Sequence, residues 1–299
     1  TKHIGLGATF STSNQHPFYA ARMWGTLDHL TNGRAAWNVV TSINRNQQAN
    51  YGTKRADADT RYDQAHEYME VCRKLWDSWD EDAFVRDRET STFFEWDKMH
   101  VLNHKGKYFQ VEGPLNVARS PQGRPVIVQA GASEEGRELA AKSADVIFAA
   151  HQNIQMAQAF YTDVKGRLAR YGRQPSDLKI MPGLSVTVAE TRAEAQAKAD
   201  ELQELIHPDH GLAYLSRRLG HDVTGYDPDK PNPNLEAVDE VGTRSGQMLD
   251  MARQKNWTLR QLYQHFAATR GHMVLVGTPV EVVDRMQEWF ENGACDGFN

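Results

Sequence analysis

The chain has 299 residues, and its 34 Lys and Arg against 39 Asp and Glu give a formal net charge of −5 at pH 7. This negative balance argues against nucleic acid or an anionic membrane as a partner, and no apolar run approaches the roughly 20 residues of a membrane span. The length suits one large barrel or doubly wound domain, or two smaller domains, and two cysteines cannot form a disulfide framework, so we expect a protein of the reducing cytoplasm.

Strand and helix patterns alternate along most of the chain. Short apolar runs predict strands at 4–9, 35–40, 125–130, 145–150 and 180–188. Amphipathic spacing and capping residues predict helices at 17–30, 63–79, 133–143, 154–171 and 278–290, with a further helix opening at the capping box of Thr191 and Glu194. The last of these helices is opened by Thr278 as the cap, with Pro279 in the first turn and Glu281 at the third position. Residues 295–299 have the pattern of a strand that has just begun.

Two stretches interrupt this alternation. Residues 80–124 contain short strand patterns joined by turns, and residues 206–271 are irregular and polar, with the loop sequence YDPDKPNPN at 226–234. Alternating strands and helices predict an α/β fold with a parallel sheet, either an open doubly wound sheet or a (β/α)8 barrel. Long insertions after strands favour the barrel, in which the loops that follow the strands build the ligand site.

The stretch VIVQAGASEEG (126–136) carries the strongest local signal for a binding site. A buried strand ends at Gln129, Gly131 allows a close turn, and Ser133 stands where a helix N-cap belongs. Free backbone N–H groups beside a hydroxyl at a helix N-terminus form a natural phosphate site. A capped helix that holds no ligand explains the same residues equally well.

Polar residues also follow two other predicted strands. Thr9 ends the first strand, and Asn38, Thr41 and Ser42 end the strand of GRAAWNVVTS (33–42). In a barrel these side chains would face one rim, where ligands bind, although ordinary capping of strand ends is the alternative for each residue.

Several other sequence patterns do not predict a binding or catalytic site. The pairs His100/His104 and His207/His210 lie in strand-like and loop-like stretches, so neither is expected to bind a metal. The aromatic residues at 76, 79, 96, 108 and 109 are expected to pack beneath the insertion. The sequence has no dinucleotide fingerprint and no P-loop.

Four segments together resemble one family. They are GRAAWNVVTS, RYDQAHEYMEVCRKLWDSW, HKGKYFQVEGPLNVARSPQGRPVIVQAGASEEGRELAAKSADVIF and VGTPVEVVDRMQEWFENGACDGF. They are similar to the nitrilotriacetate, dibenzothiophene-sulfone and long-chain-alkane monooxygenases of the bacterial-luciferase-like superfamily. The resemblance runs along the whole chain.

The resemblance implies a TIM-type (β/α)8 barrel that binds reduced FMN (FMNH2) delivered by a separate NAD(P)H:flavin reductase. With O2, reduced flavin forms a C4a-(hydro)peroxide in a dry pocket and transfers one oxygen atom to a small organic substrate. The protein then orients the flavin and excludes water, while the cofactor supplies the difficult step. The resemblance also implies a homo-oligomer, either a dimer or a tetramer.

The same resemblance assigns residues to the flavin site. Thr9 matches a hydroxyl close to the flavin, and Asn38 lies on the strand beneath the flavin ring. Tyr62 matches a tyrosine on the phosphate side. Ser133 matches the phosphate-binding serine, with Gly131 and Ala132 in the same turn. No individual catalytic residue and no metal ligand is assigned.

The sequence departs from the family in two ways. Ala58 replaces a histidine that relatives carry four residues before the Tyr62 position, and loss of one charge-assisted hydrogen bond costs about 1.5–3 kcal/mol. Relatives also have two further strand–helix units before residues 4–9 and continue past residue 299. We therefore expect an incomplete barrel, lacking the first two units and most of the last strand and helix, and a piece of a longer enzyme that is itself inactive.

One barrel domain is expected over residues 1–299, with insertions at about 43–60, 80–124 and 206–272. A non-catalytic or uncoupled FMN-binding protein is the alternative function, and a relative that uses the deazaflavin F420 is disfavoured because AWNVVTS and SPQGRPVIVQAG resemble the FMN group. The sequence leaves the substrate open among aminopolycarboxylates, sulfones, thioethers and alkanes.

Overall fold

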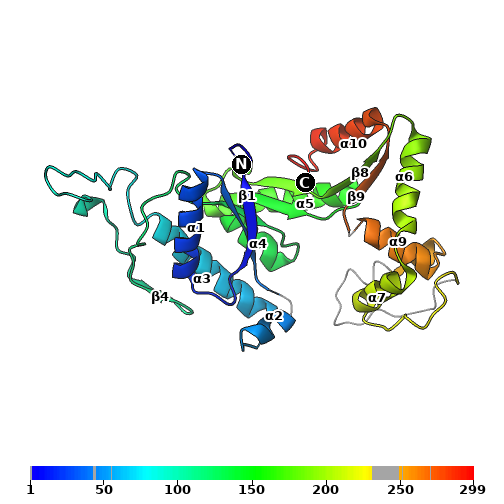
Figure 1. The fold of residues 1–299 in the computed structure, drawn as a ribbon, viewed down its shortest axis with the longest axis horizontal. Helices are drawn as coiled ribbons and strands as arrows, with labels where there is room; N and C mark the ends of the chain where they lie inside the picture. The colour runs from blue at the N-terminus through cyan, green and yellow to red at the C-terminus, as the bar shows by residue number, and fades with distance from the viewer. Residues whose placement is uncertain (1, 43–44, 55, 231–248, 251, 270) are drawn as a thin grey trace. The chain divides into compact units, whose positions relative to one another are not determined.

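A parallel sheet and the helices packed on it form the largest part of the structure (Figure 1). The computed structural model describes residues 2–42, 45–54, 56–230, 249–250, 252–269 and 271–299. Its five-stranded sheet has the order β1 (Leu6–Ser11), β2 (Ala35–Val40), β5 (Val126–Gln129), β6 (Val146–Ala149) and β7 (Lys179–Pro182). The pairs β1–β2, β2–β5 and β5–β6 are parallel, as the alternation of strands and helices predicts.

The chain divides into two compact units. Unit 1 contains residues 1–149 and 160–181, and unit 2 contains residues 150–159 and 182–299. The prediction of one barrel domain with three insertions stays a prediction.

In unit 1, the sheet buries one face against helices. Exposure alternates along β2, where Ala35, Trp37 and Val39 are buried and the residues between them are half-buried. Trp37 is fully buried, stacks on Trp24 and meets Tyr68 edge to face, and its indole N–H donates to the carbonyl of Phe10 at 3.0 Å. A period of two places alternate side chains on opposite faces, so the even-numbered residues of β2 lie on the other face.

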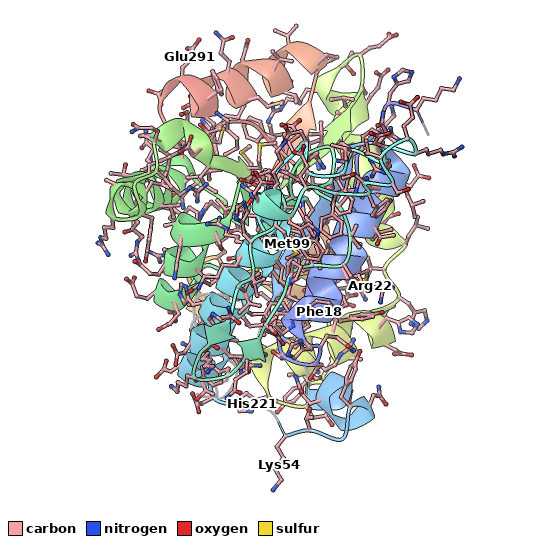
Figure 2. The ribbon with its side chains drawn as sticks, turned by 90° about the vertical axis from the view of Figure 1, so that its left-hand side faces the viewer. Phe18, Arg22, Lys54, Met99, His221 and Glu291 are labelled. Atoms are coloured by element: carbon pink, nitrogen blue, oxygen red, sulfur yellow. The ribbon has the colours of Figure 1, made fainter. Side chains whose placement is uncertain are left out.

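Three helices build the covered face. They are α1 (Pro17–Thr31), α3 (Ala58–Trp76) and α4 (Glu134–Ser143). α1 packs on α3 and α3 packs on α4 (Figure 1). Cys72, on the inner side of α3, is fully buried, as its position in the amphipathic pattern predicts. Figure 2 labels Phe18 and Arg22 one turn apart on α1, and Met99 in the insertion that follows α3.

The Glu67 carboxylate of α3 anchors the insertion at 80–124. Glu67 accepts hydrogen bonds from the backbone N–H groups of Tyr108 and Phe109 at 2.9 and 2.8 Å, and its Oε1 lies 3.2 Å from His104 Nε2. This fixes the antiparallel pair β3 (His104–Lys105) and β4 (Gln110–Val111) to the helix. The insertion also contains the 3-10 turn η1 (Trp96–Lys98).

The helical stretch predicted at 154–171 is an α-helix followed by a 3-10 turn. α5 (Ile154–Arg167) continues as the 3-10 turn η2 (Leu168–Tyr171) and ends at Gly172, which has a φ of 67°. A third 3-10 turn, η3 (Pro175–Asp177), leads into β7. The predicted end of this helical stretch at Gly172 is therefore confirmed.

Unit 2 contains a second parallel pair, β8 (Leu184–Val188) and β9 (Met273–Gly277). α6 (Arg192–Glu204) and α10 (Pro279–Glu291) open with reciprocal capping boxes at Thr191/Glu194 and Thr278/Glu281, as predicted. α7 (Pro208–Leu219) and α9 (Leu259–Thr269) share a separate apolar cluster that includes Leu215 and Tyr263.

Several sequence predictions are wrong in position or kind. α2 (Arg45–Asn50), α7, α9 and β9 were not predicted, and the strand expected at 180–188 is divided at Gly183 into β7 and β8. α3 begins five residues earlier than expected, because Asp57 caps it by accepting from the Thr60 N–H at 2.8 Å. Residues 295–299 form no strand, although Asn299 exchanges backbone hydrogen bonds with Pro182 and Leu184. Residues 231–234 of the expected loop lie outside the described residues.

Trp96 also differs from expectation. Trp76, Trp79 and Phe109 are buried as predicted, but Trp96 is 73% exposed at the surface of the insertion. None of the described helices is long and apolar enough to cross a bilayer.

The two tryptophans provide a matched test of the core. Trp37→Ala removes a fully buried ring and should lower the free energy of unfolding by about 3–5 kcal/mol. Trp96→Ala deletes the same atoms from a mostly exposed site and should change it by less than about 0.5 kcal/mol. Urea unfolding of both variants measures the difference, and equal losses would contradict this description of the core.

Candidate functional site

The end of β5 leads directly into the N-terminus of α4. β5 ends at the buried Gln129, and Ser133 is the N-cap, with its hydroxyl accepting from the Gly136 N–H at 3.2 Å. The Glu134 and Glu135 N–H groups have no intrahelical acceptor, as in every first helical turn. The predicted strand, turn and N-cap at 126–136 are confirmed.

Two glycines let this turn close tightly against α4. A Cβ on Gly131 would lie 2.7 Å from Gly136 Cα, and a Cβ on Gly136 would lie 2.8 Å from Gly131 Cα. The same Cβ on Gly136 would lie 3.1 Å from the hydroxyl oxygen of Tyr62, which comes from the second turn of α3. Side chains larger than hydrogen would fill this space, so we call Tyr62, residues 131–133 and Gly136 the glycine cradle.

The cradle has the chemistry of a phosphate site. It combines a tyrosine hydroxyl, a serine hydroxyl and the positive end of a ten-residue helix. Ala58, where the resemblance predicts histidine, is exposed one turn before Tyr62, so it adds no polar group. The structure therefore brings together four predicted residues: Tyr62, Gly131, Ala132 and Ser133.

Thr9 and Asn38 form a second group on the uncovered face of the sheet. They are register partners, and the Asn38 Nδ2 donates to the Thr9 Oγ1 at 2.9 Å. The Asn38 Oδ1 is buried and has no hydrogen-bond partner among the described residues. A buried acceptor without a donor costs about 1–3 kcal/mol, so this oxygen fits a ligand that presents an N–H.

The position of Thr9 in its strand was predicted incorrectly. β1 begins at Leu6, whose N–H donates to the carbonyl of Arg34, and continues to Ser11. Thr9 therefore lies in the middle of the strand instead of at its end, and so does its register partner Asn38 in β2.

The Thr9–Asn38 pair and the glycine cradle are separated along the direction of the strands. Asn38 is the register partner of Val128 on β5, three residues before Gly131. At about 3.3 Å per residue, roughly 10 Å of strand separates the Asn38 row from the cradle. A ligand with a planar ring at one end and a phosphate on a short flexible chain at the other matches this spacing.

Hydroxyl groups gather where β1 and β2 end. The Ser42 hydroxyl donates to the Ser11 hydroxyl at 2.5 Å, and the Ser13 hydroxyl donates to the carbonyl of Thr41 at 2.9 Å. Ser42 has a φ of 44°, a strained value for serine of the kind that concentrates at functional sites. The structure therefore brings Thr41 and Ser42 beside Ser13 and Ser11, whereas Thr9 and Asn38, predicted for the same rim, lie further back in the strands.

Asn14, beside this hydroxyl cluster, was missed by the sequence analysis. Both polar atoms of its side-chain amide are buried without a partner in the described part of the chain. A polar loop residue has no periodic pattern that would have identified it.

Two of the four paired histidines have contacts that serve the fold. His104 lies in β3 against Glu67, and His207 caps α7 instead of lying in a loop, with His210 exposed nearby. Within the described ranges, no group of three or more His, Cys, Asp or Glu side chains could hold a metal ion.

A cavity of about 460 Å³ lies elsewhere in unit 1, between α3, α4 and residues 100–102. Its lining includes Lys74, Glu70 and Lys142, and it contains no residue predicted for the site. Lys74 and Glu70 pair at 2.7 Å, so the charge of this lysine is already compensated.

Comparison with known proteins identifies the family of the chain. The model of the luciferase-like monooxygenase family matches residues 1–296. The chain belongs to this family. Its fold is accordingly of the (β/α)8 barrel type, and the resemblance inferred from the four sequence segments is confirmed.

Two relatives cover the chain completely. It is 50% identical over 303 residues to N-acetyl-S-(2-succino)cysteine monooxygenase of Bacillus subtilis, and 45% identical over 302 residues to nitrilotriacetate monooxygenase component A of Aminobacter aminovorans. The chain spans 69% and 67% of the lengths of these relatives.

A solved structure of a riboflavin lyase with modified FMN and riboflavin is also similar. The sequences are 32% identical and the TM-score is 0.81, over 100% of this chain and 66% of the lyase chain. FMN carries a ring and a phosphate on a ribityl chain, so the cradle and the unpartnered Asn38 acceptor fit this cofactor.

The cradle can be tested with two glycines in helices. Gly136→Ala forces a methyl group against the backbone of Gly131 and should lower the free energy of unfolding by about 1–3 kcal/mol. Gly166, in α5, has no heavy atom within 4 Å of a built Cβ, so Gly166→Ala should stabilise by up to about 1 kcal/mol. Denaturant midpoints report both changes, and stabilisation by Gly136→Ala would show that the turn is not tightly closed.

Proposed function

We propose that this chain carries the flavin site of the oxygenating component of a two-component monooxygenase. In this proposal a separate NAD(P)H:flavin reductase supplies reduced FMN, and the enzyme uses O2 to oxygenate a small organic substrate. Membership of the luciferase-like monooxygenase family supports the reaction class, and the names of both relatives describe monooxygenases.

The observation that carries the proposal is the glycine cradle. Two glycine Cα atoms, the Tyr62 hydroxyl and the Ser133 hydroxyl converge at a helix N-terminus, where the dipole favours an anion. The phosphate of FMN supplies such an anion, and the ring then extends toward the row that contains Thr9 and Asn38.

When bound, reduced FMN supplies the electrons that activate O2. Tyr62 and Ser133 donate hydrogen bonds to its phosphate, and the α4 amides add further donors. Asn38 orients the ring through its free Oδ1, and Thr9 holds the Asn38 amide in place at 2.9 Å.

The substrate is proposed to bind near the hydroxyl cluster at the ends of β1 and β2. The buried Asn14 amide has no partner there among the described residues and can pair with a polar group of a substrate. N-acetyl-S-(2-succino)cysteine and nitrilotriacetate are the first compounds to test, because they are named for the two relatives above.

We also propose a cytoplasmic homo-oligomer. Cys72 and Cys295 are both free and buried, which suits a reducing compartment.

Ser133→Ala tests the phosphate contact against a matched cap. Losing a hydrogen bond to a charged group costs about 1.5–3 kcal/mol, so FMN should bind about ten- to a hundredfold more weakly. Thr191→Ala removes an equivalent cap from α6 and should leave FMN affinity unchanged, while each variant loses about 1 kcal/mol of stability. Fluorescence titration measures FMN affinity, and equal affinities in the two variants would contradict the phosphate assignment.

Activity is tested with a flavin reductase, NADH, FMN and each compound. The monooxygenase proposal predicts product formation with oxygen uptake. Tight FMN binding that yields only hydrogen peroxide would instead support the alternative, an FMN-binding protein without coupled turnover.

A further inference from the structure

An ion-pair network centred on Arg167 adjoins the glycine cradle. Arg167, near the end of α5, has a side chain that is only 8% exposed. Its guanidinium donates to both carboxylate oxygens of Glu134 at 2.7 and 2.8 Å, to Glu138 at 2.9 Å, and to Asp163 at 2.9 and 3.0 Å. A buried guanidinium needs such partners, and its planar fork fits a carboxylate with two parallel hydrogen bonds.

Glu134 connects this network to the proposed phosphate site. It directly follows Ser133, so its carboxylate belongs to the first turn of the helix that carries the cradle. An uncompensated carboxylate at this position would repel a phosphate. The hydrogen bonds from Arg167 hold the pKa of Glu134 below its usual value, so the carboxylate is charged and its charge is matched.

A second branch of the network reaches the turn itself. Asp163 accepts from Arg167 through Oδ1 and from Arg137 through Oδ2, the latter at 2.8 Å. The Nε of Arg137 donates to the Ala132 carbonyl at 3.0 Å. The C=O and N–H of a trans peptide point in opposite directions, so this bond also fixes the direction of the Ser133 N–H.

We propose that Arg167 is a positioning residue for the phosphate site. It turns Glu134 away from the cradle, neutralises its charge, and through Asp163 and Arg137 holds the turn at residue 132. Arg167 itself does not touch the phosphate. This inference rests on the proposed FMN site.

The test compares FMN with riboflavin, which has the same ring and no phosphate. Arg167→Ala leaves Glu134 uncompensated and should weaken FMN binding about tenfold, with riboflavin binding nearly unchanged. Arg170→Ala is the matched control: its side chain is 66% exposed and lies 3.5 Å from Glu138, so the same change in net charge should leave both affinities unchanged.

A second substitution separates charge from folding. Arg167→Ala/Glu134→Gln removes the repelling carboxylate and should restore FMN affinity to within about threefold of the unmodified chain. Glu134→Gln alone alters a mostly exposed side chain, so it should fold even where Arg167→Ala does not. Because it leaves the Arg167 guanidinium without this counter-charge, it should tighten FMN binding about two- to fivefold and leave riboflavin binding unchanged.

The outcomes are separable. An unmodified chain that binds FMN no better than riboflavin would refute the proposed phosphate site. Selective FMN binding that Glu134→Gln does not tighten, or equal losses of FMN and riboflavin in Arg167→Ala, would overturn the role of Arg167 alone.

Discussion

The approach of Gly131 to Gly136 is the contact on which the candidate site depends. Any Cβ at either position would lie within 3 Å of the other backbone, so only glycine allows β5 to turn so closely into α4. That closeness places the helix N-terminus beside the Tyr62 hydroxyl. The proposed phosphate site is therefore mainly a property of the backbone, with Ser133 and Tyr62 offering hydroxyl groups around it.

Charged residues from α4 and α5 surround this contact. α4 begins with two acidic residues, which suit a helix N-terminus but not an adjacent phosphate. Arg167 offsets this charge at Glu134 by donating to both of its carboxylate oxygens. The same guanidinium is buried, so the pairing stabilises the fold and the site together.

Local chemistry explains which parts of the fold could be predicted. The caps at Ser133, Thr191 and Thr278 each depend on residues at most three positions apart, and all three are confirmed. α7 and α9 were missed because each buries its apolar side against the other, a contact that no single segment reveals. β9 reads MVLVG, an apolar run between the stretch interpreted as irregular (206–271) and the predicted helix at 278–290, and no strand was predicted there.

The candidate site was predictable only in part, because some of its contacts join residues far apart in the sequence. The turn and cap at 126–136 were visible from residue types, whereas the role of Tyr62 came from resemblance, because it depends on α3 packing beside α4. Arg167 lies 33 residues from Glu134 and Asn14 has no pattern around it, so neither could be found without the tertiary structure.

The central claim is that the cradle binds the phosphate of FMN. Its most direct test is a thermal melt of the chain, followed by circular dichroism, with saturating FMN, with riboflavin and without ligand. Ligand at about a hundred times its Kd adds about 2.7 kcal/mol, so FMN should raise the midpoint by several degrees and riboflavin at the same concentration by clearly less. A melt that FMN leaves unmoved, or that riboflavin shifts equally, would contradict the claim.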